Sequence, residues 1–346
     1  MPHRAACDPA LLSKLVYIVS QTPPLPLKTA VIIVNYGTAE LAIAATQSVL
    51  DRAAPQVAIH LVDNASPGGD AAILTQAHEA KGWGGRVTLY LEQENHGFGR
   101  GNNVVLQALA ADPSPPDAVL LLNPDAELET DVLSQMAQVL AEHPDVAMVG
   151  AGISKPDGTP VTAAFRFPNS VNTFAAQLGL GPITRLLKHW QVPLPPDHPA
   201  GAVDWVAGAA LLCRMQTLRA LDFFDPAFFL YFEEVDLMRR ANRAGWKTHY
   251  LPQARVIHAE GAATGVKSGQ SARKRRPAYW YDSWQMYHRK THGRFGAILA
   301  ALAYLAGTAG HHVIATLRRR PISSPRNAFS DFWRYAMQPL LVDRQK

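Results

Sequence analysis

Asn123-Pro124-Asp125 is the tripeptide whose residue types point most directly to chemistry in this chain. It follows the apolar run Ala118–Leu122, which is typical of a strand buried on both faces. Asn-Pro turns the chain out of that strand, so Asp125 and Glu127 are expected at its carboxyl end, where open α/β sheets bind ligands. A carboxylate beside a neutral amide suits a hard divalent cation that holds a diphosphate. An ordinary Asn-Pro turn with a solvated aspartate is the alternative.

Three earlier segments that read as strands also end in polar residues. These polar ends are Asn35-Tyr36, Asp63-Asn64-Ala65-Ser66 and Asn95-His96-Gly97. In a parallel sheet the carboxyl ends of the strands lie along one edge. The sequence therefore predicts a single polar crevice at that edge.

The elements that must position these residues alternate between strand and helix. Strands are expected at 30–35, 57–63, 86–91, 118–122 and 146–149, and helices near 39–52, 70–80, 101–111 and 131–142. This alternation predicts an α/β fold, a doubly wound and mainly parallel sheet with helices on both faces.

Three carboxylates gather in the segment Glu233-Glu234-Val235-Asp236, which follows an aromatic and apolar stretch. Like charges this close to one another and to apolar side chains should raise the pKa of at least one of them. Asp236 and Arg240 have the i, i+4 spacing of a helical ion pair. An acidic helix N-terminus stabilised by the helix dipole is the alternative for the whole cluster.

Seven segments, taken in order, resemble the family 2 inverting glycosyltransferases of the GT-A fold, and most of all the bacterial rhamnosyltransferase-like branch. They read VIIVNYGTAE, LVDNAS, ENHGFGRGNN, LLLNPDAEL, VDWVAGAALLCR, FFDPAFFLYFEEVDLMRRANRAGW and VIHAEGAATG. The resemblance implies a GT-A glycosyltransferase domain over 29–265. An extension or linker at 1–28 would precede it, and a helical, basic, membrane-associating region at 266–346 would follow it.

The resemblance implies transfer of a sugar from a nucleoside diphosphate sugar, with rhamnose from dTDP-rhamnose as the leading guess. A divalent cation, Mg²⁺ or Mn²⁺, would neutralise the diphosphate as it leaves. Asp125 is the expected metal ligand, although Asn123 stands where the family motif usually has a first aspartate. His258 resembles the histidine that approaches the metal or diphosphate from the far side of the cleft. A satisfied structural histidine is the alternative.

Other residues are implied in binding the nucleotide sugar. Asp63 resembles the aspartate that hydrogen-bonds the base, and a turn-forming aspartate is the alternative. Asn95, Gly97 and Asn102 belong to a segment like the one over the ribose and donor sugar, where glycine permits close backbone approach. A flexible helix entrance is the alternative there. The expected nucleotide-sugar site is completed by Asn35, Tyr36, Asn64 and Asn123.

The resemblance places the catalytic base in the second half of the chain. Inverting transfer needs a carboxylate that accepts the proton of the acceptor hydroxyl. Glu234 matches the position of that base, although the family pattern there is usually Glu-Asp. Glu233 and Asp236 are the other candidates, with Glu233 holding acceptor hydroxyls. Trp205 and Gly208 are expected to line the acceptor or donor-sugar pocket, with core packing as the alternative for Trp205.

The basic residues of the chain concentrate near its end. Residues 255–346 hold 16 Lys and Arg against 4 Asp and Glu, while the whole chain has a net charge of +5. Within them, 295–317 is a stretch of 23 residues without formal charge. It is long enough to span a membrane, but its glycines and histidines favour a helix lying on an anionic membrane surface, flanked by the basic residues 273–276 and 318–320.

Five aromatic residues precede that stretch and would suit the headgroup layer of a membrane: Tyr279, Trp280, Tyr281, Trp284 and Tyr287. The alternative is that these rings pack on the catalytic domain and that the long helix closes a core or a dimer contact. A homodimer therefore stays open.

Composition fits an intracellular enzyme. Two cysteines in 346 residues make no disulfide framework, and residues 1–28 lack the long apolar core of a signal peptide. We expect a cytoplasmic, peripheral protein at the inner face of the cell membrane. Its acceptor would be a glycan or a polyprenyl-linked saccharide in cell-surface polysaccharide synthesis, and we expect no nucleic-acid partner.

Two other classes of function stay open. One is a nucleotidyltransferase, which is disfavoured because Tyr36-Gly37-Thr38 is too short for a phosphate-binding glycine loop. The other is a non-catalytic module that binds a nucleotide sugar or nucleic acid. Turnover of a donor sugar in the presence of Mg²⁺ or Mn²⁺ distinguishes the transferase from both.

Overall fold

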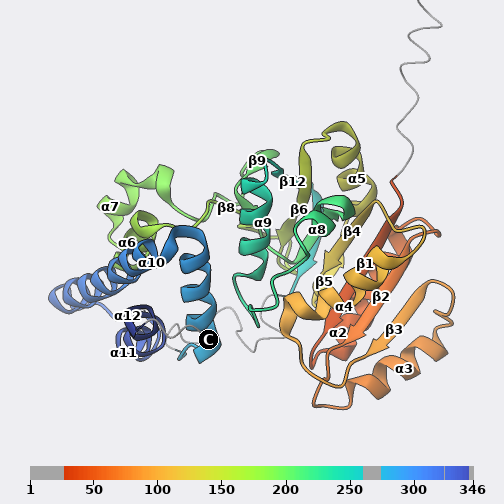
Figure 1. The fold of residues 1–346 in the computed structure, drawn as a ribbon, viewed down its shortest axis with the longest axis horizontal. Coiled ribbons are helices and arrows are strands. Elements are labelled where there is room, and N and C mark those ends of the chain that lie inside the picture. The colour runs from red at the N-terminus through yellow and green to blue at the C-terminus, as the bar shows by residue number, and fades with distance from the viewer. Residues whose placement is uncertain (1–26, 260–273, 323, 343–346) are drawn as a thin grey trace, which may run out of the picture.

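The computed structural model describes residues 27–259, 274–322 and 324–342, and a ten-stranded sheet forms its largest element (Figure 1). In spatial order its main strands are β3 (Val87–Leu91), β2 (Ala58–Asp63), β1 (Thr29–Asn35), β4 (Ala118–Leu122), β11 (Ala210–Arg214), β6 (Val146–Ser154), β12 (Lys247–His258) and β5 (Ala126–Leu128). Two short strands, β7 (Pro160–Val161) and β9 (Gly201–Val203), pair with β6 and β12. Strands β8 (Ala164–Phe165) and β10 (Trp205–Val206) form a separate pair.

The first four strands run parallel, as the alternating sequence pattern predicted. β1 lies between β2 and β4, with Asn35 opposite Asp63 and Ile33 opposite Leu122. Every residue of β4 is buried, because this strand sits in the middle of a sheet with both faces covered. The register therefore brings the polar strand ends together at one edge.

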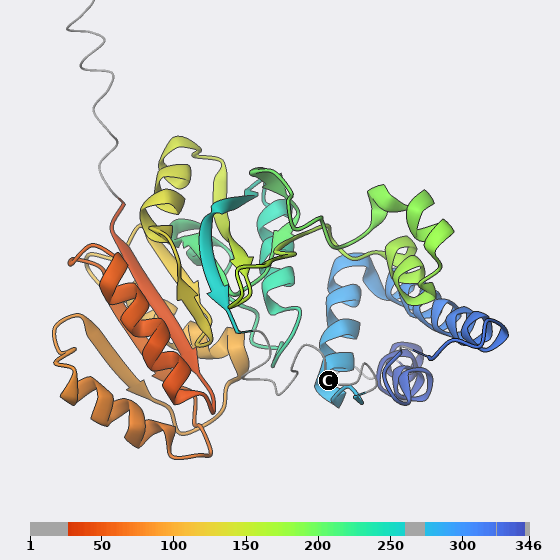
Figure 2. The ribbon, with the colours of Figure 1, turned by 180° about the vertical axis from the view of Figure 1, so that it is seen from behind.

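Helices cover both faces of this sheet (Figures 1 and 2). They are α2 (Ala39–Arg52), α3 (Asp70–Ala80), α4 (Gly97–Ala111), α5 (Val132–Glu142), α8 (Met215–Ala220) and α9 (Glu233–Arg243). The predicted helices agree with α2, α3 and α5 to within one residue, whereas α4 begins at Gly97 rather than near Gly101. The apolar residues of α5 that face the sheet recur at helical spacing, and Asp131 caps the helix by accepting a hydrogen bond from the Ser134 amide.

A second group of helices lies beside the sheet (Figure 2). It consists of α6 (Ser170–Leu178), α7 (Gly181–Leu186), α10 (Ala278–Leu317), α11 (Ala328–Phe332), a π-helical turn (Trp333–Met337) and α12 (Gln338–Val342). The long helix α10 contains a break at Gly293, whose φ of 70° and ψ of 174° are not helical. Of the residues described, only those of α10 form a helix long and apolar enough to cross a membrane by length and composition.

A separate apolar core holds these helices together. Trp284 of α10 packs edge-on against Phe332 of α11, and Phe332 stacks on Tyr304 with ring centroids 3.8 Å apart. Tyr281, Trp284 and Tyr287 are buried. The expectation that these three rings lie in a headgroup layer is therefore wrong: Tyr287 packs on the domain of the large sheet, as the alternative has it, whereas Tyr281 and Trp284 belong to the separate helical core. An aromatic helix face suits a protein core as well as a membrane interface, and here other helices cover it.

Candidate functional site

Asn35, at the end of β1, is the centre of a buried polar network. Its side-chain amide donates hydrogen bonds to Asp63 Oδ1 and to Asp70 Oδ2, each at 3.0 Å. Asp63 Oδ1 also accepts a bond of 2.6 Å from the Ser66 hydroxyl. Asp70 additionally accepts from the Ala39 amide at the start of α2. The structure thus brings two predicted residues together and adds Asp70, which the sequence analysis missed because it reads as an ordinary first residue of a helix.

The asparagines at 64 and 95 shape the entrance to α4. Asn64 donates to Asn95 Oδ1 at 3.1 Å and to the Gly97 carbonyl at 3.0 Å. Asn95 Oδ1 in turn accepts from the Gly97 amide at 2.8 Å. Gly97 has a φ of +73°, and a Cβ there would lie 1.8 Å from the Phe229 carbonyl oxygen. Only glycine permits this contact between the α4 entrance and the segment that leads to α9.

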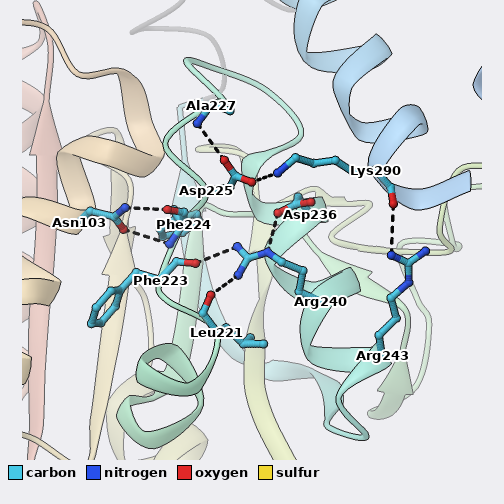
Figure 3. A network of polar contacts seen from close by, with 10 residues as sticks. All are labelled: Asn103, Leu221, Phe223, Phe224, Asp225, Ala227, Asp236, Arg240, Arg243 and Lys290. Carbon is cyan, nitrogen blue, oxygen red and sulfur yellow. Dashed lines mark hydrogen bonds and ion pairs between the residues drawn. The ribbon is translucent and has the colours of Figure 1, made fainter. Parts of the chain in front are cut away.

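Asn102 and Asn103 have different roles within α4. Asn102 is buried and donates to the Phe98 carbonyl one turn earlier. Asn103 both donates to the Phe224 carbonyl, at 2.8 Å, and accepts from the Phe224 amide, at 3.1 Å (Figure 3). This pair of hydrogen bonds to a segment 121 residues away was not predicted, since adjacent asparagines in a sequence do not show which of them has a distant partner.

Asp125 and His258, the two predicted metal ligands, lie in direct contact. His258 Nε2 is 2.9 Å from Asp125 Oδ1, and both side chains are largely buried. The Ala259 amide donates to the Asp125 carbonyl, which ties the end of β12 to the turn after β4. Gly261, Thr264 and Gly265, which accompany this histidine in the sequence motif, lie outside the described residues.

This pair fits part of a divalent-cation site. Neighbouring ligands of an octahedral ion with bonds of about 2.1 Å lie about 3 Å apart, close to the 2.9 Å between these two atoms. The Asp125 carboxylate also suits Mg²⁺ or Mn²⁺ together with substrate oxygens. Among the described residues, no group of three or more His, Cys, Asp or Glu is arranged to hold a metal by itself. A cation here would therefore depend on the diphosphate of a donor for further ligands.

The acidic start of α9 lies in the protein interior. Glu233 is buried, and Glu233 Oε2 and Glu234 Oε2 have no hydrogen-bond partner in the described part of the chain. Burial raises the pKa of Glu233 well above its ordinary value, and the neighbouring Glu234 raises it further. Burial also raises the pKa of Glu234. The prediction that this cluster has a raised pKa is consistent with these directions, and desolvation is the main cause.

Asp236 forms the predicted ion pair with Arg240, whose Nε lies 2.7 Å from Asp236 Oδ2. The same guanidinium donates to the carbonyls of Leu221 and Phe223 (Figure 3). Burial raises the pKa of Asp236, while Arg240 opposes that shift. Asp236 therefore anchors the loop before α9, which is a structural role.

Gly208 lies between the start of α9 and the turn that bears Asp125. A Cβ on Gly208 would lie 3.9 Å from the Cγ atom of Glu234 and 3.9 Å from the Phe98 ring. The adjacent Ala209 carbonyl accepts a hydrogen bond of 2.9 Å from the Asn123 amide. Residues 208–209 thus join the turn that bears Asp125 to the start of α9.

Two other predicted residues differ in their surroundings. Trp205 stacks on Phe165 with ring centroids 4.1 Å apart, and its indole N–H donates to the Arg166 carbonyl. Both the ring and its polar group are therefore engaged in packing, and a place in a substrate pocket stays a prediction. Tyr36 follows β1 at the polar edge and has an exposed side chain, as a residue that meets a ligand requires.

Comparisons with known proteins identify the family to which the sequence is similar. A family model described as "Glycosyltransferase like family 2" matches residues 24–280. The chain is 28% identical over 220 residues to the N-acetylglucosaminyl-diphospho-decaprenol L-rhamnosyltransferase of Mycobacterium tuberculosis (strain CDC 1551 / Oshkosh), covering 60% of this chain and 68% of that protein. It is 26% identical to the rhamnosyltransferase WbbL of Escherichia coli (strain K12), over 49% of this chain and 63% of that one.

Two solved structures show the likeness in fold. GalNAc-T7 with UDP, GalNAc and Mn²⁺ superposes with a TM-score of 0.52 and 14% identity, covering 93% of this chain and 59% of that one. Mannosyltransferase PcManGT from Pyrobaculum calidifontis, in complex with GDP-Man and Mn²⁺, superposes with a TM-score of 0.51 and 14% identity, covering 97% and 95%. The predicted α/β fold of GT-A type is therefore confirmed.

The raised pKa of Glu233 makes a prediction about stability. A carboxyl group that binds its proton more tightly in the folded state contributes stability below its ordinary pKa of 4.5, and that contribution is lost as pH rises through the folded pKa. Glu233→Gln, which cannot ionise, should therefore be more stable than the parent at pH 8, where the parent must hold an ionised carboxylate in a buried position.

Urea unfolding at pH 4.5 and pH 8 measures this difference, which should shrink toward zero at the lower pH. The exposed Glu79 of α3 provides the control, because Glu79→Gln should change stability equally little at both pH values. A Glu233→Gln variant that gains nothing at pH 8 would contradict the burial of a carboxylate with a raised pKa.

Proposed function

This chain belongs to glycosyltransferase family 2, and we propose that it transfers a sugar from a nucleoside diphosphate sugar to an acceptor hydroxyl with inversion at the anomeric carbon. The observation that carries the proposal is the junction at residues 208–209, where Gly208 lies beside Glu234 of α9 and the Ala209 carbonyl is hydrogen-bonded to the turn that bears Asp125. A proton acceptor beside a site suited to a cation and diphosphate is the combination that inverting transfer needs.

Glu234 is the proposed catalytic base. As the acceptor oxygen bonds to the anomeric carbon, its proton passes to the Glu234 carboxylate, and the bond to the diphosphate breaks with its electron pair on the leaving group. The Oε2 atom of Glu234 forms no hydrogen bond with any described residue, so its lone pairs are not already occupied by a protein donor there. The raised pKa of Glu234 brings its basicity closer to working pH. Glu233, one residue earlier, is proposed to hold acceptor hydroxyls.

Asp125 and His258 would hold a divalent cation that offsets the charge of the departing diphosphate. The nucleotide and donor sugar are proposed to bind along the polar strand ends. The proposed residues there are Asn35, Tyr36, Asp63, Asn64, Asn95, Gly97, Asn102 and Asn123. Because Asn35 is already hydrogen-bonded to Asp63, and Asn64 to Asn95, the proposed part of these four residues is to present a rigid edge.

The donor and acceptor are proposed from the relatives. Two of them are named as rhamnosyltransferases, which supports rhamnose from dTDP-rhamnose as the donor. One name specifies a saccharide carried on diphospho-decaprenol, which supports a polyprenyl-linked acceptor in cell-surface polysaccharide synthesis at the cytoplasmic face of the membrane. A module that binds a nucleotide sugar without turnover is the other candidate, because Asn123 and Glu234 depart from the usual family residues.

The second half of α10 supplies a surface suited to such a membrane. Apolar residues exposed on it recur at intervals of three or four, which places them on one helix face: Phe295, Leu299, Leu302, Ala306, Ala309, Val313 and Leu317. We call this face the α10 stripe. It ends at the exposed arginines 318–320, whose charge complements an anionic lipid surface.

The opposite face of α10 is covered by the protein itself. Gly307 lies against the Phe174 carbonyl of α6, and Tyr304 stacks on Phe332 of α11. A helix with one face in the protein core and the other exposed is suited to lie in the membrane surface and not to span it. Arg275 is engaged with Asp331 and Arg276 with the Trp280 ring, so the proposal rests on the arginines at 318–320.

The first prediction of this proposal concerns turnover. The parent protein should transfer or hydrolyse dTDP-rhamnose in the presence of Mn²⁺ or Mg²⁺, and Asp125→Asn should remove at least about 99% of that turnover. The variant keeps the size of the side chain and a hydrogen bond to His258, so its thermal unfolding should be close to that of the parent. Calorimetric titration of Mn²⁺ in the presence of dTDP should show weaker binding to the variant.

Metal-dependent turnover that survives Asp125→Asn would refute the assigned metal ligand. Protection of the parent against thermal unfolding by dTDP-rhamnose, with no turnover under any metal, would instead identify a binding module.

A second prediction separates the carboxylates of α9. Glu234→Gln should lower turnover at saturating substrate by about a hundredfold or more, because it removes the general base while keeping size and shape. Asp236→Asn is the matched control and should chiefly lower stability, since Asp236 pairs with Arg240. If Asp236→Asn is the inactive variant and Glu234→Gln keeps its turnover, the base is Asp236 and not Glu234.

A third prediction concerns the α10 stripe. Leu302→Glu, at a side chain 47% exposed, should weaken binding to vesicles that contain phosphatidylglycerol by about tenfold or more, because it removes apolar area and adds a negative charge. Binding of the parent should also weaken between roughly 0.1 M and 0.5 M salt, because the Debye screening length falls by about a factor of two over that range.

Ile73→Glu is the control, because Ile73 is 38% exposed on α3, outside the stripe. Cosedimentation measures all three proteins. If Leu302→Glu binds vesicles like the parent but converts a dimer to a monomer, the stripe is a contact between two copies and the membrane proposal is wrong.

A further inference from the structure

The two residues before α9 have an unusual backbone conformation. Tyr231 has a φ of 71° and Phe232 a φ of 67°, a left-handed region that large side chains rarely adopt. Two consecutive aromatic residues in this region persist only where the surrounding structure holds them. Since Phe232 is the N-cap of α9, this turn decides where the helix and its first carboxylates begin.

The first half of α10 holds this turn. The Ser283 hydroxyl donates a hydrogen bond of 2.9 Å to the Leu230 carbonyl. The Phe232 ring packs against Tyr287, with centroids 5.5 Å apart, and against Trp280, at 6.0 Å. Side chains from two successive turns of α10 thus contact the residues that precede the acidic helix.

Further contacts join α10 to the segment before α9. Tyr231 stacks on Tyr279 with ring centroids 6.0 Å apart. Lys290 forms an ion pair with Asp225, and Arg243 of α9 donates to the Lys290 carbonyl (Figure 3). The whole segment from 225 to 232 is therefore bound along one side by α10, while Gly97 of α4 contacts it at Phe229.

The hydrogen bonds that lower the pKa of the two carboxylates come from the backbone of residues 233–235, at the start of α9 itself. Glu233 Oε2 and Glu234 Oε2 have no hydrogen-bond partner among the described residues. The Asp236 amide donates to the Phe232 carbonyl, which closes the first turn of α9 on the strained residue. The positions of both glutamates therefore follow from the turn and from the rings packed behind it.

We infer that Tyr287 and Ser283 are positioning residues for the acceptor-activating carboxylates, acting through the Tyr231–Phe232 turn. Both lie beyond residue 280, where the match to the family model ends, and on the far side of the predicted domain boundary at 265. The inference rests on the proposed role of Glu234 as base. It makes the first half of α10 part of the catalytic unit.

Tyr287→Ala, with Tyr287→Phe as the conservative variant, tests this role. Removing the ring releases the turn, and a displacement of about 1 Å is enough to cost about a hundredfold in kcat. The KM for dTDP-rhamnose should change less than about threefold, an estimate that follows because no nucleotide contact is removed. Tyr287→Phe should restore most of the activity. Ser283→Ala, which loses one hydrogen bond, should lower kcat about two- to tenfold.

Tyr304→Ala is the matched control. Tyr304 is an equally buried tyrosine of the same helix whose ring stacks on Phe332. Its link to the turn is indirect, through a hydrogen bond from Arg276, which lies over the Trp280 ring. It should lower the unfolding temperature as Tyr287→Ala does, yet keep kcat near that of the parent at a temperature where both variants are folded. Equal loss of kcat in both variants would mean that α10 acts only through general stability, and the inference would be wrong.

Amide hydrogen exchange provides a test that does not depend on turnover. Exchange at residues 233–236 should accelerate in Tyr287→Ala and stay unchanged in Tyr304→Ala. Unchanged exchange and unchanged kcat in a folded Tyr287→Ala variant would overturn the inference. If exchange accelerates while Glu234→Gln keeps full turnover, the turn is held as inferred and the assignment of the base in the proposed function is what fails.

Discussion

The buried carboxylate of Glu233, with the half-buried Glu234 beside it at the start of α9, imposes the constraint on which the arrangement of this protein depends. Taking a carboxylate out of water costs several kcal/mol in proteins unless it is paired or protonated, and one oxygen of Glu233 and one of Glu234 lack a partner in the described chain. The surrounding core must offset that cost. Gly99 of α4 lies against Glu233 and Gly208 against Glu234, while the Tyr287 ring of α10 packs on Phe232, the residue before the pair.

The long helix α10 has a different environment on each side of its break at Gly293. Its first half packs against the turn that precedes the buried glutamates, and its second half shares a core with α6 and α11 while exposing the α10 stripe. A single helix therefore joins the proposed lipid surface to the proposed base. A glycine suits this break because its φ of 70° is unfavourable for any residue with a Cβ.

Prediction from sequence succeeded where short-range patterns decide structure. The fully apolar run of β4, the i, i+4 pair of Asp236 and Arg240, and the crowding of acidic residues each have a local physical cause, and each has its expected counterpart in the structure. The aromatic residues of α10 were assigned wrongly in part. Their spacing marks a face to be covered, but whether lipid or protein covers it depends on helices that are distant in the chain.

The sequence by itself determined the alternation of strands and helices, the polar ends of the first parallel strands and the acidic start of α9, because periodicity and neighbouring residues suffice for these. Only the tertiary structure decided which distant groups meet. Asp125 contacts His258 across 133 residues and Asn103 reaches Phe224 across 121, while Gly97 lies against Phe229 and α10 against the Tyr231–Phe232 turn. Such contacts depend on how completed elements pack, which no local pattern records.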